Sequence, residues 1–163
     1  MMPTNYVIRK VMQQDNKPIA HLIRKVFIEF DAPKEGTVYS DKATDYLFEY
    51  FDTNNAALFV LEEKGEIAGV CGIYPTLGLP KSCIEIVKFY IRPESRGQGF
   101  GFALFNTCQL EAKAKGYSQL YLESIPDFKT AVNLYLKLGF TQLDKRLGET
   151  GHFGCDLWFS KSI

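Results

Sequence analysis

The chain lacks both an excess of charge of either sign and a long apolar run. Nineteen basic residues balance nineteen acidic ones among 163, so no overall positive field attracts nucleic acid or an anionic membrane. The longest uninterrupted apolar stretch, residues 56–61, is far shorter than the roughly 20 residues that span a bilayer. The first nine residues also lack the apolar segment of a signal peptide. We therefore expect a cytoplasmic protein that binds neither membranes nor nucleic acid.

Cysteine is scarce and scattered. The chain has no CxxC pair, and each cysteine lies in or beside an apolar segment: Cys71, Cys83, Cys108 and Cys155. This pattern is typical of reduced, mostly buried thiols and predicts neither a disulfide framework nor a metal site. With 46% apolar residues, the chain can bury a sizeable core. Its length favours one domain over residues 1–163.

Hydrophobic periodicity divides the first half into a strand and two helices. We expect the strand at residues 6–11, where apolar and polar side chains alternate. A helix capped by Asp15 should follow, and a second helix should start at Ser40 or Asp41. The buried stripe expected on this second helix consists of Tyr46, Leu47, Tyr50 and Phe51.

The second half alternates β-prone and helical segments. A short polar connection that contains Gly65 predicts a β-hairpin. The elements expected from there on are strands at 57–62, 67–74 and 83–91, a helix from Gly99 or Gly101 to about residue 115, a strand at 120–123, a helix at 129–138 and two strands within 140–159. This order predicts a mixed sheet flanked by helices.

The most informative segment joins the long strand at 83–91 to the helix after it. Arg96 and three glycines, Gly97, Gly99 and Gly101, stand directly before this helix. A helix N-terminus presents unpaired N–H groups and a positive partial charge. Glycine also lets the backbone approach a diphosphate closely. The segment therefore predicts an anion-binding loop.

Two nucleotide-binding motifs do not fit this loop. A dinucleotide fingerprint requires G-x-G-x-x-G, but Phe102 occupies the position of the third glycine. A Walker loop ends in Gly-Lys-Ser/Thr, whereas Phe102 and Ala103 follow Gly101. No lysine is therefore placed for phosphates and no hydroxyl for magnesium.

The loop resembles motif A, R/Q-x-x-G-x-G/A, of the GCN5-related N-acetyltransferases through Arg96, Gly99 and Gly101. Residues 131–140 resemble motif B of that family, a helix with a tyrosine, here Tyr135, that ends in Gly-Phe before a strand. The alternative is a glycine-rich turn that merely connects a strand to a helix. One position departs from the pattern, because Phe128 stands where many members carry an asparagine that holds pantetheine.

The resemblance implies an α/β (α+β) GNAT fold in which acetyl-CoA lies between splayed strands. The sheet would be mixed and mostly antiparallel, with six or seven strands and about four flanking helices. Pantetheine would pair with the backbone of the long strand, and the loop would bind the pyrophosphate. The implied cofactor-binding residues are Phe89, Tyr90, Ile91, Arg96, Gly97, Gln98, Gly99, Phe100, Gly101 and Tyr135.

The resemblance also implies direct attack of an acceptor amine on the thioester. Glu85 is the expected base, because it interrupts an otherwise apolar strand, where an ionisable group is costly unless it is paired or functional. Tyr135 is expected to protonate the departing thiolate. The alternatives are a carboxylate paired with a nearby cation and a packing tyrosine. A backbone N–H at a strand bulge within residues 89–91 would stabilise the oxyanion.

Residues 147–155 resemble a Leu-Gly-x-Thr-Gly-His-x-x-Cys segment of a bacterial subgroup of the family. Their glycines predict a tight loop between the last two strands, with His152 at its tip. His152 would line the acceptor pocket or contact a partner subunit, or it is an ordinary hydrogen-bonded histidine. Acidic residues near the acceptor entrance, such as Glu29 and Glu123, would attract a cationic amine, or they are solvated surface charges.

The expected function is transfer of an acetyl group from acetyl-CoA to a primary amine of a small molecule, peptide or protein. The competing function is a noncatalytic acyl-CoA-binding or sensing module, because such a loop can persist where chemistry has been lost. Thiol release in the presence of amines separates the two. Members of the family often form dimers, which makes a homodimer compatible with the resemblance.

Overall fold

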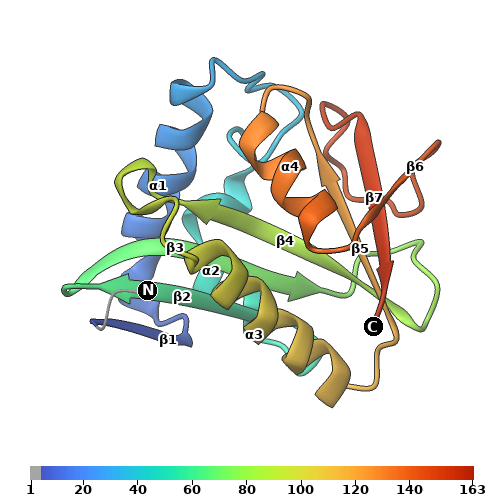
Figure 1. The fold of residues 1–163 in the computed structure, drawn as a ribbon, viewed down its shortest axis with the longest axis horizontal. Helices are drawn as coiled ribbons and strands as arrows, with labels where there is room; N and C mark the ends of the chain where they lie inside the picture. Colours follow the sequence, from blue (N-terminus) through green and yellow to red (C-terminus); the bar gives the residue numbers. More distant parts are fainter. Residues whose placement is uncertain (1–4) are drawn as a thin grey trace.

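A single mixed sheet runs through the computed structural model, which describes residues 5–163 (Figure 1). Its strands lie in the order β1-β2-β3-β4-β5-β7-β6. They are β1 (Tyr6–Lys10), β2 (Ala57–Glu63), β3 (Glu66–Tyr74), β4 (Cys83–Ile91), β5 (Gln119–Ser124), β6 (Thr141–Leu143) and β7 (Leu157–Ser162). The α-helices are α1 (Asn16–Glu29), α2 (Leu47–Phe51), α3 (Phe100–Ala114) and α4 (Lys129–Lys137).

The sheet is antiparallel except at its centre. Strands β1 to β4 form an antiparallel series, β4 pairs with β5 in parallel, and β5, β7 and β6 are antiparallel again. The predicted mixed, mostly antiparallel sheet with flanking helices is confirmed. Helices α3 and α4 cover one face, and α1 and α2 cover the other (Figure 1). Each face thus contributes its own buried apolar cluster.

The β2–β3 hairpin forms where the sequence predicts it. Lys64 and Gly65 connect the strands, and both have positive φ angles, 53° and 81°. A two-residue turn of this kind matches the right-handed twist of the strands. Glycine adopts a positive φ without the steric cost that a side chain brings. The hairpin therefore has a fixed turn between the end of β2 and the start of β3.

The predicted second helix is wrong in its extent and in half of its buried stripe. The Asp41 carboxylate accepts the Ala43 N–H and begins a 3₁₀ turn at Lys42–Asp45, and Tyr46 then leaves helical geometry with φ −135° and ψ 42°. After this break the chain continues as the short helix α2, which turns only part of the predicted stripe inward. Leu47 and Phe51 are buried as predicted, whereas Tyr46 and Tyr50 are 63% and 44% exposed.

Asp15 does not cap α1 with its side chain. Its carboxylate instead accepts two hydrogen bonds from the Arg9 guanidinium, at 2.7 and 3.1 Å, and one from the Met12 N–H at 2.7 Å. Asp15 is almost fully buried, so pairing with a cation stabilises it more than a cap would. It thereby fixes the connection between β1 and α1.

The remaining helices and strands lie within a few residues of their predicted bounds. All four cysteines are free thiols, three of them buried and Cys155 half-buried. Within residues 5–163, none of the helices has the length and apolar character that crossing a bilayer requires.

Candidate active site

Strands β4 and β5 separate soon after they pair. Their parallel pairing covers only Cys83–Glu85 of β4 against Gln119–Tyr121 of β5, although β4 continues to Ile91 and β5 to Ser124. The two strands diverge beyond this point, as Figure 1 shows. The backbone of β4 from residue 86 onward therefore has no β5 partner and faces a gap.

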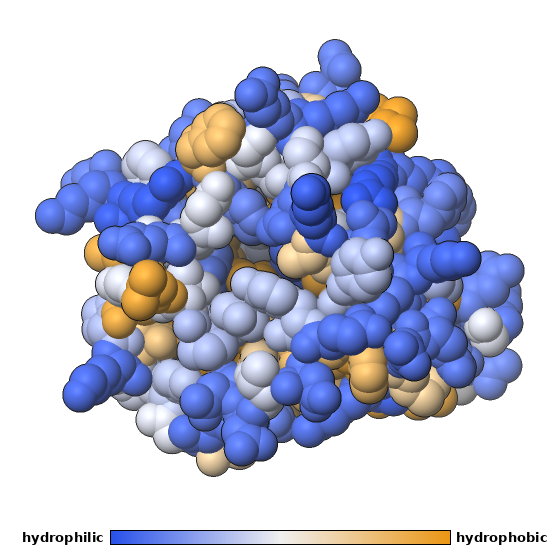
Figure 2. All heavy atoms as spheres, turned by 180° about the vertical axis from the view of Figure 1, so that it is seen from behind, coloured by the Kyte–Doolittle hydropathy of each residue, from blue (hydrophilic) through white to orange (hydrophobic). Residues whose placement is uncertain are grey.

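A cleft of about 840 Å³ occupies this gap, a size typical of small-molecule and cofactor sites. One end is lined by residues 96–101, which we call the glycine loop, with the exception of Gln98. The polar end, as we use the term below, is lined by Asp41, Glu85, Lys88, Glu123 and His152. Figure 2, the face opposite to that of Figure 1, shows a hollow near its centre with hydrophilic and hydrophobic side chains mixed around it.

The glycine loop is held in a conformation that favours glycine. Gly97 and Gly99 have φ angles of 75° and 84°, and Gly99 is the N-cap of α3 without a side-chain cap. A Cβ on Gly97 would meet no atom within 4 Å, so its surroundings are open. A Cβ on Gly101 would lie 3.1 Å from Leu134 Cδ2 on α4. The first N–H groups of α3 are thus presented beside exposed glycine backbone, as anion binding requires.

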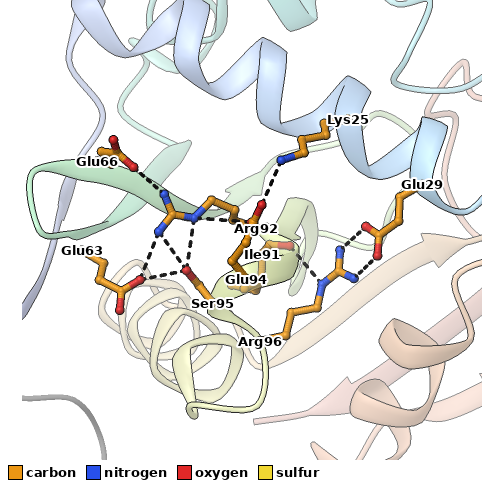
Figure 3. A network of polar contacts seen from close by, with 9 residues as sticks. All are labelled: Lys25, Glu29, Glu63, Glu66, Ile91, Arg92, Glu94, Ser95 and Arg96. Atoms are coloured by element: carbon orange, nitrogen blue, oxygen red, sulfur yellow. Dashed lines mark hydrogen bonds and ion pairs between the residues drawn. The ribbon is translucent and has the colours of Figure 1, made fainter.

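An ion-pair network fixes the start of the loop to the β2–β3 hairpin. The Arg92 guanidinium donates to Glu66 at 2.8 Å, to Glu63 at 3.2 Å and to the Ser95 hydroxyl at 3.1 and 3.2 Å. Ser95 in turn donates to Glu63 at 2.8 Å. Figure 3 shows these contacts between the strand end and the hairpin. Because Glu63 and Ser95 are buried, the network holds the backbone just before the glycine loop.

Arg96 does not point freely toward the cleft. Its guanidinium forms a two-point pair with Glu29 of α1, at 2.7 and 2.9 Å, and donates to the Ile91 carbonyl at 3.2 Å (Figure 3). It also lies over the Phe30 ring at 5.3 Å. The expectation that Glu29 attracts a cationic acceptor is therefore wrong, because this carboxylate is already neutralised by Arg96.

A β-bulge interrupts β4 at the level of the cleft. Val70 of β3 pairs with Tyr90, but Gly72 pairs with Val87, so two residues of β4, Lys88 and Phe89, oppose one of β3. Lys88 has a φ of 55°. The bulge thus begins one residue before the predicted range of 89–91. Bulges re-aim side chains and free backbone groups beside active sites.

Glu85 is a buried carboxyl group in the polar end. It accepts a short hydrogen bond from the Thr76 hydroxyl, and its residue is 5% exposed. Burial raises its pKa to about 8, which outweighs the opposing effect of the Thr76 hydrogen bond. Among residues 5–163, Glu85 forms no direct ion pair with a cation, so the predicted alternative of a paired carboxylate is wrong.

Tyr135 lies on α4 and is buried between both sides of the gap. Its ring centre is 6.1 Å from that of Phe89 on β4 and 5.8 Å from that of Phe159 on β7. Burial raises the pKa of the Tyr135 hydroxyl, with a weaker opposing effect from Ser124. The hydroxyl therefore stays protonated throughout the neutral and mildly alkaline range, as a proton donor must.

The C-terminal segment closes over the polar end, but not as a tight loop with His152 at its tip. Residues 144–156 form a long connection, in which Phe153, next to His152, is 70% exposed. The His152 ring turns inward to Asp41, with Nε2 2.9 Å from Oδ2. The Gly154 N–H donates to the Gly36 carbonyl at 2.9 Å. These contacts join segments that are distant in sequence.

Glu123 is not a solvated charge, since only 3% of its side chain is exposed. Its oxygens accept hydrogen bonds from the Tyr121 hydroxyl at 2.6 Å and from Thr150 at 2.7 Å. Arg146 lies 3.3 Å away. Glu123 therefore positions the C-terminal connection at the cleft wall.

The cleft brings together nearly all residues nominated from the sequence. Glu85, Glu123, Tyr135 and His152 line it, as do the nominated cofactor residues except Gln98. Phe128 contacts Phe27 and Phe30 in an aromatic cluster, with ring centres at 5.0 and 5.7 Å. Apolar packing thus replaces the hydrogen bond of an asparagine at this position. In the part of the chain that the structure describes, no cluster of three or more potential metal ligands occurs.

Sequence reasoning missed Lys88 and Asp41, which complete the polar end. Lys88 carried the same signal as Glu85, a charged residue in an otherwise apolar strand. Asp41 carried a different signal, that of a helix cap, and it does cap the 3₁₀ turn at Ala43. Its contact with His152, which lies 111 positions away, cannot be predicted from the spacing of nearby residues.

Comparison with known proteins identifies the family to which the chain belongs. Residues 14–140 match the Acetyltransferase (GNAT) family. The chain is 34% identical over 156 residues to the uncharacterized N-acetyltransferase YjgM of Escherichia coli, covering 95% of this chain and 93% of that protein.

Solved structures share the fold. An acetyltransferase from Streptococcus agalactiae superposes with a TM-score of 0.85 at 14% identity, covering 99% of this chain and 100% of the other. A Salmonella typhimurium acetyltransferase, yncA, solved with its cofactor acetyl-CoA, superposes with a TM-score of 0.76 at 17% identity, covering 98% and 94%. The chain therefore belongs to the Acetyltransferase (GNAT) family and is an N-acetyltransferase.

Proposed function

We propose that the protein transfers the acetyl group of acetyl-CoA to a primary amine by direct attack in a ternary complex. One observation carries this proposal. The splayed β4–β5 gap has the glycine loop at one end, the buried carboxyl of Glu85 at the other, and Tyr135 in its wall. An anion site, a base and an acid thus surround one cleft, as acyl transfer between two bound substrates requires.

The cofactor would lie along β4. Its diphosphate would accept hydrogen bonds from the N–H groups of residues 97–101, and its pantetheine would pair with the free edge of β4. The Arg96 guanidinium is engaged by Glu29 and the Ile91 carbonyl. We therefore assign Arg96 the role of fixing the loop, and we assign diphosphate binding to the backbone. Acetyl-CoA is also the cofactor of the Salmonella protein with the same fold.

The chemical step follows from the groups beside the gap. The amine nitrogen attacks the thioester carbon, and ionised Glu85 takes the proton that the nitrogen loses, directly or through a water. A backbone N–H of the bulge at Lys88 and Phe89 stabilises the oxyanion. The C–S bond then breaks, and Tyr135 gives its proton to the departing thiolate. Each proton transfer of this kind contributes about 10² to 10⁴ in rate.

Thiol release tests this function. The protein is incubated with acetyl-CoA and a panel of amino acids, polyamines, aminoglycosides and peptides, and free CoA thiol is followed over time. We expect release that requires one class of amine and stops when that amine is consumed. Tight CoA binding by calorimetry with no release on any acceptor would instead indicate a sensing module.

Gly97→Ala should raise KM for acetyl-CoA about 10- to 100-fold. A Cβ at a φ of 75° strains the loop backbone. Loss of one charge-assisted hydrogen bond to the diphosphate costs about 1.5–3 kcal/mol. KM and the dissociation constant of CoA are the measurements.

Gly116→Ala is the matched control, because Gly116 also has a positive φ, 88°, and open surroundings, but lies at the far end of α3. Both variants should lose similar thermal stability, and only Gly97→Ala should lose cofactor affinity. Equal KM values in the two variants would remove the diphosphate from this loop.

A further inference from the structure

Lys88 is a buried cation that has no hydrogen-bond or ion-pair partner among the described residues, 5–163. The residue is 7% exposed and lines the polar end of the cleft. Among residues 5–163, no hydrogen bond or close ion pair involves its ammonium group. Burial accordingly lowers its pKa, although Asp41 and Glu85 act in the opposite direction from a distance. Burial of an ammonium group is unfavourable in free energy unless an opposite charge or hydrogen-bond acceptors compensate for the lost water. We therefore expect a bound ligand to supply this compensation.

The backbone at Lys88 adds a second, independent cost. Its φ of 55° lies in the left-handed region, which glycine adopts freely and residues with a Cβ avoid. Glycine at this position would form the same bulge without that strain. The presence of a long cationic side chain at this strained position therefore indicates that the bulge serves to aim Lys88 into the cleft, because strain of this kind is concentrated at functional sites.

The other charged groups of the polar end already have partners. Glu85 accepts from Thr76, Asp41 accepts from His152 and from the Ala43 N–H, and Glu123 accepts from Tyr121 and Thr150. Lys88 is thus the charged group here whose hydrogen-bonding capacity remains open, with three N–H donors. The matching ligand is an anion, and a carboxylate accepts such donors with charge assistance.

We propose that Lys88 binds the carboxylate of the acyl acceptor, so that the acceptor is a free amino acid whose amine reaches the thioester while its carboxylate pairs with Lys88. This inference rests on the proposed function and names its substrate class. Glu85 and Lys88 lie three residues apart on β4, with the bulge between Val87 and Tyr90 turning Lys88 toward the same cleft. Glu85 can thus act as the base for the amine while Lys88 binds the carboxylate of the same acceptor.

The walls of the polar end favour a small acceptor over a peptide. The C-terminal connection crosses to the segment before α2 through the His152–Asp41 contact and the Gly154–Gly36 hydrogen bond. The Glu149 N–H also donates to the Leu77 carbonyl at 2.8 Å, on the connection after β3. These contacts bound the polar end on two sides and so limit the length of an acceptor that fits there.

Matched acceptor pairs test the proposal. Each pair consists of an L-amino acid and the amine that remains when its α-carboxylate is removed, such as phenylalanine with phenethylamine and histidine with histamine. We expect the wild-type protein to give a kcat/KM at least about tenfold higher for the acid of its preferred pair. A wild-type preference for the decarboxylated amines would overturn the proposal, whatever the variants do.

Lys88→Met should abolish this discrimination. Methionine keeps an unbranched side chain of similar length at the strained position and removes the charge. We expect KM for the amino acid to rise about 10- to 100-fold, with KM for acetyl-CoA unchanged. Lys88→Arg keeps a cation and should retain most of the preference for the acid. Lys81→Met, at an exposed residue outside the cleft, is the control and should behave as wild type.

The outcomes separate this inference from the function on which it rests. If no amine of any kind releases thiol, the proposed function fails. If amines release thiol but the pairs do not differ, or if Lys88→Met keeps the wild-type ratio, only the role of Lys88 fails. An acetyl group found by mass spectrometry on Lys88 after incubation with acetyl-CoA alone would also overturn it, because the amine would then be a nucleophile.

Discussion

Replacement of Glu85 by Gln is expected to lower kcat about 10²- to 10⁴-fold above pH 8, because the amide has nearly the shape of the carboxyl but cannot accept a proton. The wild-type rate should rise with pH until it passes about 8, where the buried carboxyl ionises. The measurement is kcat for both proteins from pH 6 to 10 with one amine acceptor. The ratio of the wild-type kcat to the variant kcat should increase up to about pH 8 and then become constant.

The ratio of the two kcat values separates the ionisation of Glu85 from the ionisation of the acceptor amine. The acceptor amine also loses a proton as the pH rises, but that change affects both proteins equally and cancels. A ratio that stays the same at every pH would remove Glu85 from the role of base. KM for acetyl-CoA serves as the control, since Glu85 lies in the polar end and not in the glycine loop.

The same carboxyl links stability to pH. Because the pKa of Glu85 is raised from its ordinary 4.5 to about 8 in the folded protein, folding favours the protonated form. The corresponding stability is complete below about pH 4.5 and is lost as the pH rises through about 8. The Glu85→Gln protein cannot ionise here, so it should lose less thermal stability than the wild type between pH 5 and 9.

Local patterns predicted the parts of the fold that depend on local physics. Gly65 at the hairpin and Gly99 at the start of α3 both occupy positive-φ positions, and each was recognisable because glycine tolerates a conformation that other residues avoid. Glu85 was recognisable because a charge in an apolar strand is costly. These signals require only the chain within a few residues of the position.

The rest of the site depends on contacts that local spacing does not encode. The sequence predicts Arg96 at the pyrophosphate, but Glu29, 67 positions earlier, pairs with it. The sequence also predicts His152 at a loop tip, but its ring turns inward to Asp41. The orientation of Lys88 depends on the register between β3 and β4. Register and ion pairing arise from the assembled sheet, so periodicity along one strand does not reveal them.

Tyr135→Phe is expected to lower kcat about 10²- to 10⁴-fold, because phenylalanine has no proton to give to the departing thiolate. The ring packing against Phe89 and Phe159 is retained, so KM for acetyl-CoA and thermal stability should change little. Burial raises the pKa of the hydroxyl, which keeps it protonated at alkaline pH. The loss in rate should therefore be equally large at pH 7 and pH 9.

A variant of a second tyrosine serves as the control, because it shows whether losing a tyrosine hydroxyl outside the cleft also lowers kcat. Tyr117, after α3, is half-buried and does not line the cleft, so Tyr117→Phe should keep wild-type turnover. If Tyr135 only packed, its variant would match the Tyr117 variant in kcat. A large loss confined to Tyr135 would instead require that the thiolate leaves toward α4, which fixes the direction in which the thioester lies across the β4–β5 gap. The base on β4 would then take the proton of the attacking amine, and the acid on α4 would protonate the sulfur that leaves.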